Sequence, residues 1–314
     1  MKAPLVSVAI ITYNHSDYVA KAINSVINQQ CDFDFEIVVG DDCSTDNTSE
    51  ICRQFALLYP EKIRHIRNKN NLGYIKNLLM VFNECKGKFI AILEADDHWT
   101  SISKIADQVN VFKQNRNVSL CFTNSIIDDT LATNNKYYFK RSADLIFTAK
   151  DCLTHCVAPT STFMFKKGLF EQPSWFTNLT SYEYFLIYLM ADKGNIYYLN
   201  KITSCRTQHY RGQSTTTISN DSMMKCELIY LNALAKHYST KNKKLVQNII
   251  LKNQIATISH CLAEKKIALV RELLPHVKIL NLRFSKNGIQ VFCSYVKLVS
   301  NYTRKKILHK DSNA

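Results

Sequence analysis

Three carboxylates follow directly on a short apolar run in this chain. The run Phe89-Ile-Ala-Ile-Leu leads into Glu94, Asp96 and Asp97, with one alanine as a spacer. An uncharged run of this length is typical of a buried strand, and clustered carboxylates at its end are costly unless a positive charge neutralises them. Oxygen ligands of this kind suit Mg²⁺ or Mn²⁺, which take further ligands from water and substrate phosphates. The segment predicts a cation site at a sheet edge, and its alternative is an acidic turn that caps the next helix.

The elements that must position these acids follow an alternating order. Stretches with helical spacing separate short apolar runs that are typical of strands. The expected strands are 6–12, 36–40, 63–67, 89–93 and 118–124, and the expected helices are 16–27, 48–58 and 75–85. Ser16 is the expected N-cap of the first helix. This β-α-β-α order predicts an α/β domain whose mostly parallel sheet is flanked by helices.

Glycine usage bears on how such a domain could hold phosphate. The chain has only seven Gly and lacks both G-x-G-x-x-G and G-x-x-x-x-G-K-[ST]. The usual glycine-cradled dinucleotide and triphosphate sites are therefore absent from the sequence. We expect a metal to hold any phosphate, and the missing glycine-rich loop also argues against a nucleotidyltransferase.

Composition limits the class of protein. A chain of 314 residues with 46% hydrophobic content can fold as one large domain with an appendage or as two modest domains. No apolar window approaches the roughly 18 residues of a transmembrane helix, and the first apolar run is expected to be a strand, not a signal peptide. The eleven Cys show no paired C-x-x-C spacing. We expect reduced thiols in a cytoplasmic protein.

The net charge of +14 is concentrated in the last third of the chain. Residues 221–314 hold 17 Lys and Arg against 5 Asp and Glu, interleaved with apolar residues at helical spacing. We therefore divide the chain into an α/β domain at 1–220 and a basic α-helical region at 221–314. Two interpretations of that region stand: a peripheral helix on an anionic membrane, or a helical subdomain that packs on the first domain. No nucleic-acid partner is expected, because no nucleic-acid-binding signature accompanies the charge.

The order and spacing of several motifs resemble those of family 2 glycosyltransferases. This family has a nucleotide-sugar-binding α/β fold of the Rossmann-like type called GT-A. The resemblance covers roughly residues 5–215. The matching segments are Val6–Asn14, Glu36–Asp46, Asn70–Asn77, Glu94–Asp97, Tyr182–Leu199 and Cys205–Ser214.

The resemblance implies a role for the polar residues of these segments. Asp42 would pair with the base of the nucleotide. Asp96, with Glu94 and Asp97, would take the place of the family's metal-binding D-x-D motif, although Asp is commoner than Glu at its first position. Residues that would bind the nucleotide sugar are Thr12, Asn14, Asp42, Asn71, Glu94, Arg206 and Arg211.

Glu183 stands where an acid begins the family's acceptor-cleft helix, again as Glu where Asp is commoner. The resemblance implies that it is the catalytic base. The segment Cys205–Ser214 resembles the Y-R-x-H segment that closes over the diphosphate, with Cys205 at the aromatic position and His209 displaced.

The resemblance implies a complete function. The protein would be an inverting, metal-assisted glycosyltransferase that moves a sugar from a nucleotide-diphosphate sugar, with UDP favoured, to a glycan or lipid-linked acceptor. Its pathway would be bacterial surface-polysaccharide assembly, such as capsule or lipopolysaccharide, at the inner face of the cytoplasmic membrane if the basic region binds lipid. The alternative is a nucleotide-sugar-binding module or scaffold that has lost turnover. Retention of every expected carboxylate argues against that alternative.

Overall fold

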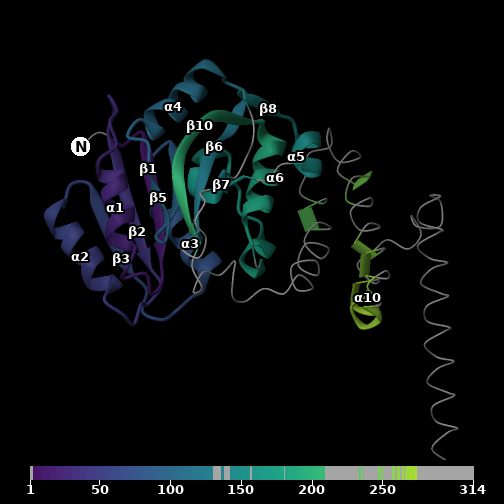
Figure 1. Ribbon diagram of the computed structural model, residues 1–314, viewed down its shortest axis with the longest axis horizontal. Helices are drawn as coiled ribbons and strands as arrows, with labels where there is room; N and C mark the ends of the chain where they lie inside the picture. Colours follow the sequence, from purple (N-terminus) through teal and green to yellow (C-terminus); the bar gives the residue numbers. More distant parts are fainter. Residues whose placement is uncertain are drawn as a thin grey trace, which may run out of the picture. The chain divides into compact units, whose positions relative to one another are not determined.

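The computed structural model divides the chain into two compact units, Met1–Thr217 and Ile218–Ala314 (Figure 1). The structure describes residues 3–129, 136–137, 142–155, 158–179 and 181–208, and in the second unit residues 233, 234, 236, 247, 248, 250, 257, 258, 260, 261, 264 and 266–273. Within the second unit the described segments include helix α10 (Ile267–Leu273). Most of the basic region therefore lies outside the described residues.

A ten-stranded sheet forms the centre of the first unit, with the strand order β3-β2-β1-β4-β9-β6-β10-β5, to which β7 and β8 add at β6 and β10. Its strands are β1 (Val6–Thr12), β2 (Phe35–Asp41), β3 (Ile63–Arg67), β4 (Phe89–Glu94), β5 (His98–Trp99), β6 (Val118–Asp129), β7 (Lys136–Tyr137), β8 (Leu145–Phe147), β9 (Met164–Lys166) and β10 (Asn195–Gln208). The pairs β3-β2, β2-β1, β1-β4 and β6-β10 are parallel, and β9 is antiparallel to both β4 and β6. The predicted mostly parallel sheet is confirmed.

Helices accompany the sheet in the expected alternation (Figure 1). They are α1 (Val19–Ile27), α2 (Thr48–Leu58), α3 (Tyr74–Glu84), α4 (Lys104–Gln114), α5 (Ala149–His155) and α6 (Glu183–Lys193), with 3-10 turns η1 (Thr160–Thr162), η2 (Lys167–Leu169) and η3 (Ser174–Asn178). The first helix begins two residues later than expected, with Tyr18 rather than Ser16 at its N-cap position. Ser16 instead donates its backbone N–H to the Asp46 carboxylate in the β2–α2 loop, at 3.1 Å.

Two helices pack on opposite faces of the same strands. Every residue of β1 and β2 is buried, as a central strand with both faces covered requires. Val8 in β1 and Ile37 in β2 join Ile23 of α1 in one core cluster. Gly40 points to the other face, where a Cβ would lie 2.3 Å from the Val81 side chain of α3. The close approach of α3 to β2 therefore depends on the absence of a side chain at Gly40.

The register of the parallel strands brings their carboxyl ends to one edge of the sheet. Thr12 lies opposite Asp41, and Ile11 lies opposite Glu94. The backbone N–H of Asp42 donates to the Thr12 carbonyl at 2.9 Å, which carries the β1–β2 pairing one residue further. In open α/β sheets this edge is where ligands bind. The fold therefore places Thr12, Asp42 and Glu94 at the same edge.

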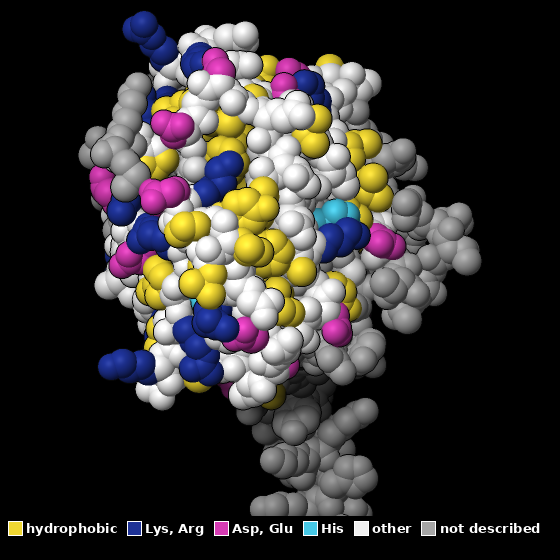
Figure 2. Space-filling view, turned by 90° about the vertical axis from the view of Figure 1, so that its left-hand side faces the viewer, with side chains coloured by type: hydrophobic (Ala, Val, Ile, Leu, Met, Phe, Trp, Pro, Cys, Tyr) yellow, Lys and Arg dark blue, Asp and Glu magenta, His cyan; other side chains and the backbone are white. Residues whose placement is uncertain are grey.

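The surface of the first unit carries both signs of charge. On the side shown in Figure 2, Lys and Arg side chains alternate with Asp and Glu around a broken band of hydrophobic side chains. This mixture matches the nearly balanced charge of residues 1–220. Single exposed apolar residues in the unit, such as Leu57 and Leu58 at the end of α2, are ordinary for a folded protein. Among the described residues, no helix has both the length and the apolar character needed to span a bilayer.

One lysine, at the start of α4, is completely buried against the Trp99 ring of β5. The Lys104 side chain is 0% exposed, lies 4.1 Å from the centre of the Trp99 ring and donates to Gln108 at 2.7 Å. Burial lowers the pKa of Lys104 to about 7. In the unfolded chain a lysine keeps its ordinary pKa near 10.4. The unfolded state therefore binds more protons than the folded state between about pH 7 and 10, and folding stability contributed through Lys104 rises with pH across that window.

We predict that replacing Lys104 with methionine flattens the pH dependence of stability. The free energy of unfolding of the native chain should rise relative to Lys104→Met by about 1.4 kcal/mol per pH unit above pH 7. Urea unfolding of both proteins at pH 7.0 and about pH 8.5 measures this difference, and cysteine ionisation cancels because both chains share it. Lys76→Met, at an exposed position on α3, should show no such change. If the difference in the free energy of unfolding between the native and Lys104→Met proteins is the same at both pH values, Lys104 stays charged in the folded state.

Candidate active site

The acids that follow β4 lie in a tight turn at the sheet edge. The backbone N–H of Ala95 donates to the Ile11 carbonyl of β1 at 3.0 Å, and that of Asp97 donates to the Glu94 carbonyl at 3.0 Å. The side chains of Glu94 and Asp96 are partly exposed, whereas Asp97 is 7% exposed. The end of β4, which is hydrogen-bonded to β1, thus carries two partly exposed acids, Glu94 and Asp96, and one buried acid, Asp97.

Two tyrosine hydroxyls hold the Glu94 carboxylate. Tyr74, at the start of α3, donates to Glu94 Oε1 at 3.0 Å, and Tyr182, just before α6, donates to the same oxygen at 3.3 Å. Burial, together with the neighbouring carboxylates of Asp96 and Glu183, raises the pKa of Glu94 to about 7. Burial and the same carboxylate surroundings raise the pKa of both tyrosines well above the usual value, so both hydroxyls stay protonated donors.

The buried Asp97 connects the acidic turn to β10. One of its carboxylate oxygens accepts the backbone N–H of Thr207 at 3.0 Å. Burial raises the pKa of Asp97 well above its usual range, and the charges of Asp96 and Glu94 add to this effect. Thr207 follows Arg206 in the chain, so this bond also places the half-buried Arg206 near the turn. Arg211 lies outside the described residues.

Glu183 is the first residue of α6 and belongs to the same acidic group. Its carboxylate accepts a hydrogen bond from the Ser181 hydroxyl, and its side chain is partly exposed. It is close enough to Glu94 to raise the pKa of that residue. The fold therefore brings the predicted base on α6 to the predicted metal residues after β4, from segments about ninety residues apart.

The acidic group suits a cation that brings its own further ligands. Repulsion between crowded carboxylates is one cause of the raised pKa values of Glu94 and Asp97, and a bound cation would relieve it. Within the part of the chain that the structure describes, no three His, Cys, Asp or Glu side chains are grouped so that they alone could hold a metal. Mg²⁺ characteristically uses one or two protein carboxylates and completes its shell with water and phosphate. The donor set fits such a cation, with substrate phosphate as a co-ligand.

Asp42 organises the loop beside the expected nucleotide pocket. Its Oδ1 accepts the backbone N–H of Leu72 at 2.8 Å and the Asn68 side-chain amide at 2.9 Å, and its Oδ2 accepts the backbone N–H of Gly73 at 2.8 Å. The side chain is 3% exposed. A carboxylate oxygen can accept two hydrogen bonds, so Oδ2 retains capacity for one donor from a ligand. The Thr12 hydroxyl nearby is buried and has no hydrogen-bond partner among the described residues.

The two predicted asparagines shape loops. Asn14 has a left-handed backbone with φ of 56°, and its side-chain oxygen accepts the backbone N–H of Thr45 at 2.8 Å. Asn71 is exposed, and its side-chain oxygen accepts the backbone N–H of Gly73 at 3.1 Å. Both contacts are of the turn-forming type that Asn favours. They hold the loops that follow β1 and β3.

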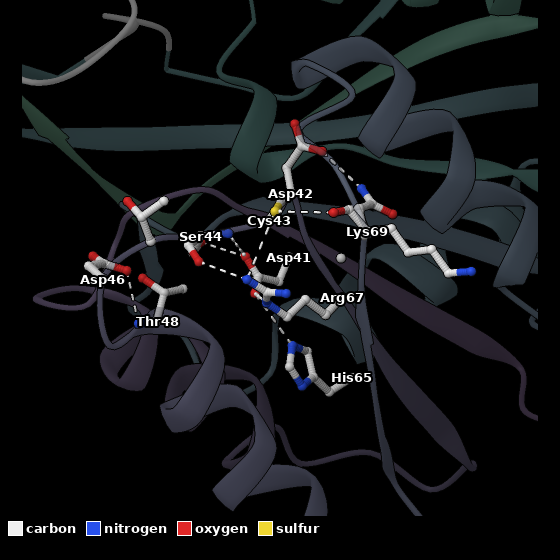
Figure 3. A network of polar contacts seen from close by, with 12 residues as sticks. Asp41, Asp42, Cys43, Ser44, Asp46, Thr48, His65, Arg67 and Lys69 are labelled. Carbon is white, nitrogen blue, oxygen red and sulfur yellow. Dashed lines mark hydrogen bonds and ion pairs between the residues drawn. The ribbon is translucent and has the colours of Figure 1, made fainter.

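A network around Asp41 supports this loop from below and has no counterpart in the sequence predictions (Figure 3). Asp41 Oδ2 lies 3.9 Å from His65 Nε2 and 3.6 Å from Arg67 Nε, and Oδ1 accepts the backbone N–H of Ser44 at 3.0 Å. Burial alone would raise the pKa of Asp41, but the nearby His65 side chain and the hydrogen bonds from Ser44 outweigh it and lower the pKa to about 2. Figure 3 shows Asp42 turned away from this network. His65 and Arg67 stand two residues apart in the expected strand 63–67, which puts both on one face, and this spacing was the signal that could have revealed the network.

Comparisons with known proteins show the family to which the chain belongs. The family model for Glycosyl transferase family 2 matches residues 7–172, more than half of the chain. An uncharacterized glycosyltransferase of Nostoc sp. is 31% identical over 173 residues, covering 53% of this chain and 52% of that protein. The putative teichuronic acid biosynthesis glycosyltransferase TuaG of Bacillus subtilis is 32% identical over 120 residues, covering 38% of this chain and 46% of that protein. The matches span between 28% and 52% of the length of the curated relatives.

The solved structures support the fold. TarS residues 1–349 of S. aureus in complex with UDP-GlcNAc match with a TM-score of 0.65 at 16% identity, covering 96% of this chain and 92% of that one. The mannosyltransferase PcManGT of Pyrobaculum calidifontis matches with a TM-score of 0.53 at 14% identity, covering 97% and 87%. The expected GT-A class is confirmed at the level of fold. With its sheet-edge acids, its loop around Asp42 and the family match over residues 7–172, the chain belongs to glycosyl transferase family 2.

Proposed function

We propose that this protein is an inverting glycosyltransferase that moves a sugar from a nucleoside-diphosphate sugar, with UDP favoured, to a glycan or lipid-linked acceptor in surface-polysaccharide assembly. One observation carries the proposal. Tyr182, the residue directly before Glu183, donates its hydroxyl to Glu94 Oε1 at 3.3 Å, so the start of α6 lies beside the acids after β4. A base for the acceptor hydroxyl and a site for the diphosphate's cation would thus be adjacent.

Features of the similar proteins support the substrate class. The matching TarS structures include complexes with UDP-GlcNAc and with UDP, and PcManGT is described in complex with GDP-Man and Mn²⁺. TuaG is named for teichuronic acid biosynthesis. The ligands and names of these proteins support a nucleotide-sugar donor and a surface-polysaccharide pathway for this chain.

The chain's own residues would divide the work of transfer between two sides of the site. Asp42 would accept a base N–H at Oδ2, beside the Thr12 hydroxyl and the loops that Asn14 and Asn71 fix. Asp96, with Glu94 or Asp97, would hold Mg²⁺ or Mn²⁺, whose charge would stabilise the departing diphosphate. Arg206 and Arg211 would lie over that diphosphate. Glu183 would take the proton of the acceptor hydroxyl as its oxygen attacks the anomeric carbon, with inversion.

The basic region supports a lipid-linked acceptor. Residues 221–314 carry +12 of the net charge, and most of them lie outside the described residues. Lysine-rich helical segments bind anionic membrane surfaces at about 1 kcal/mol per basic residue near the surface. We include in the proposal a peripheral contact of this region with the inner face of the cytoplasmic membrane.

Calorimetric titration with UDP, GDP and dTDP, with and without Mn²⁺, tests donor recognition. We expect UDP to bind most tightly and more tightly with Mn²⁺. Asp42→Asn should weaken UDP binding about tenfold or more, because the variant presents an amide donor to the base N–H or to the Gly73 N–H. Asp32→Asn, at an exposed position, is the matched control and should bind like the native chain.

Two results would count against this account. Unchanged UDP affinity in a folded Asp42→Asn protein would remove the base-pairing role. Tight, metal-dependent nucleotide binding without turnover in any acceptor-containing extract would establish the alternative function, a nucleotide-sugar-binding module or scaffold.

A further inference from the structure

Two helices that carry different parts of the site meet at one carboxylate oxygen. Tyr74 is the first residue of α3, which follows the Asp42-bound loop, and Tyr182 is the residue just before α6. Their hydroxyls lie 3.0 Å and 3.3 Å from Glu94 Oε1, and their ring centres are 5.4 Å apart. Because both hydroxyls use Oε1, neither occupies Oε2 of the same carboxylate.

Glu94 is a fixed point for these contacts. It ends β4 in register with Ile11 of β1, and the next residue, Ala95, donates its backbone N–H to Ile11 at 3.0 Å. The backbone at Glu94 therefore moves only if the central sheet moves. A side chain that hydrogen-bonds to Glu94 is therefore anchored to the central sheet.

The two tyrosines join the donor side of the site to the base. On one side, the backbone N–H of Gly73 donates to Asp42 Oδ2 at 2.8 Å, and Tyr74 follows directly. On the other side, Tyr182 is completely buried and Glu183 follows directly. A continuous series of contacts thus runs from the residue expected to bind the base of the donor to the residue expected to accept the proton.

We propose that Tyr74 and Tyr182 are positioning residues, which hold Glu183 at a fixed place relative to the bound donor by sharing Glu94 Oε1. The inference rests on the proposed function, because Glu183 must be the base for its position to matter. A shift of about 1 Å in a reacting group can cost a hundredfold in rate. Hydroxyl contacts that set the start of α6 therefore have a direct effect on transfer.

Phenylalanine substitutions separate positioning from packing. Tyr182→Phe and Tyr74→Phe keep the rings and remove only the hydroxyls. We expect each to lower kcat roughly tenfold or more, because a small displacement of a reacting group is costly, with donor KM nearly unchanged. The lost hydrogen bond should lower the thermal midpoint by a few degrees only. Tyr59→Phe, which alters a 40% exposed tyrosine at the end of α2, is the matched control and should keep native kcat.

A double-mutant cycle with Glu94→Gln tests whether the tyrosines act through this carboxylate. The effect of Tyr182→Phe on kcat should shrink to about twofold or less when Glu94 is already glutamine, because the shared contact is then altered in both proteins. An equal effect in both backgrounds would overturn the inference. If Tyr182→Phe does not fold, the same cycle with Tyr74→Phe, whose ring is only partly buried, decides the question.

Turnover by the native chain and by the two phenylalanine variants distinguishes failure of this inference from failure of the proposed function. Absence of turnover by the native chain with every donor would refute the proposed function itself. Native turnover with unchanged kcat in both phenylalanine variants would leave the proposed function standing and overturn the positioning role.

Discussion

Replacing Asp96 with alanine should abolish metal-dependent turnover, with kcat/KM falling about a thousandfold. A cation at a departing diphosphate contributes several kcal/mol of transition-state stabilisation, and each 1.4 kcal/mol is a factor of ten. Asp96 is partly exposed at the turn after β4 and stands at the position of the family's metal motif, which makes it the central candidate ligand.

The measurement for Asp96→Ala is release of nucleoside diphosphate over a range of Mn²⁺ concentrations. The matched control is Asp32→Ala, which removes an exposed carboxylate between α1 and β2 and should keep native turnover and native metal dependence. We expect that Mn²⁺ at concentrations that saturate the native protein does not restore turnover by Asp96→Ala. Native kcat and native Mn²⁺ dependence in a folded Asp96→Ala protein would exclude Asp96 as a ligand.

Replacing Glu183 with glutamine should lower the rate of sugar transfer by about a hundredfold to ten-thousandfold while donor binding stays intact. General-base catalysis contributes factors of this size. Glutamine preserves the length of the side chain and its ability to accept from the Ser181 hydroxyl, but it cannot take a proton at neutral pH. The loss should therefore appear in kcat and leave the affinity for nucleoside diphosphate unchanged.

Single-turnover transfer with saturating donor measures the Glu183→Gln effect directly. Glu61→Gln, at an exposed position before β3, is the charge-matched control. Transfer at the native rate would rule Glu183 out as the base. Parallel loss of donor binding and transfer would show that the residue serves the fold of the site rather than proton transfer.

The architecture of the first unit was predictable from local patterns. The run Phe89–Leu93 is apolar and uncharged because β4 is buried between β1 and β9, and such burial leaves a direct trace in the sequence. The sequence signal for the start of α1 was weaker. Ser16 has the right type for an N-cap, but its backbone N–H bonds to Asp46 thirty residues away, a partner that no local pattern specifies.

The acids of the candidate site, Glu94, Asp96, Asp97 and Glu183, could also be proposed from the sequence. Metal binding and proton transfer require carboxylates, and the family motifs indicate where in the chain they stand. The contacts that hold them were not. Tyr74 and Tyr182 are 108 residues apart, and only the packed fold shows that both hydroxyls reach Glu94 Oε1. Asp42 is another case. Its type was informative, yet its bonds to the backbone of Leu72 and Gly73 depend on the β3–α3 loop that folds back over it.

Nucleoside-diphosphate release from a panel of UDP-, GDP- and dTDP-sugars, with Mn²⁺ and an acceptor-containing extract, tests the central claim most directly. The account predicts metal-dependent turnover of one donor, a UDP-sugar, that depends on acceptor and disappears in Asp96→Ala. Saturable nucleotide binding by the full chain with no diphosphate release from any donor would contradict the assignment of a transferase.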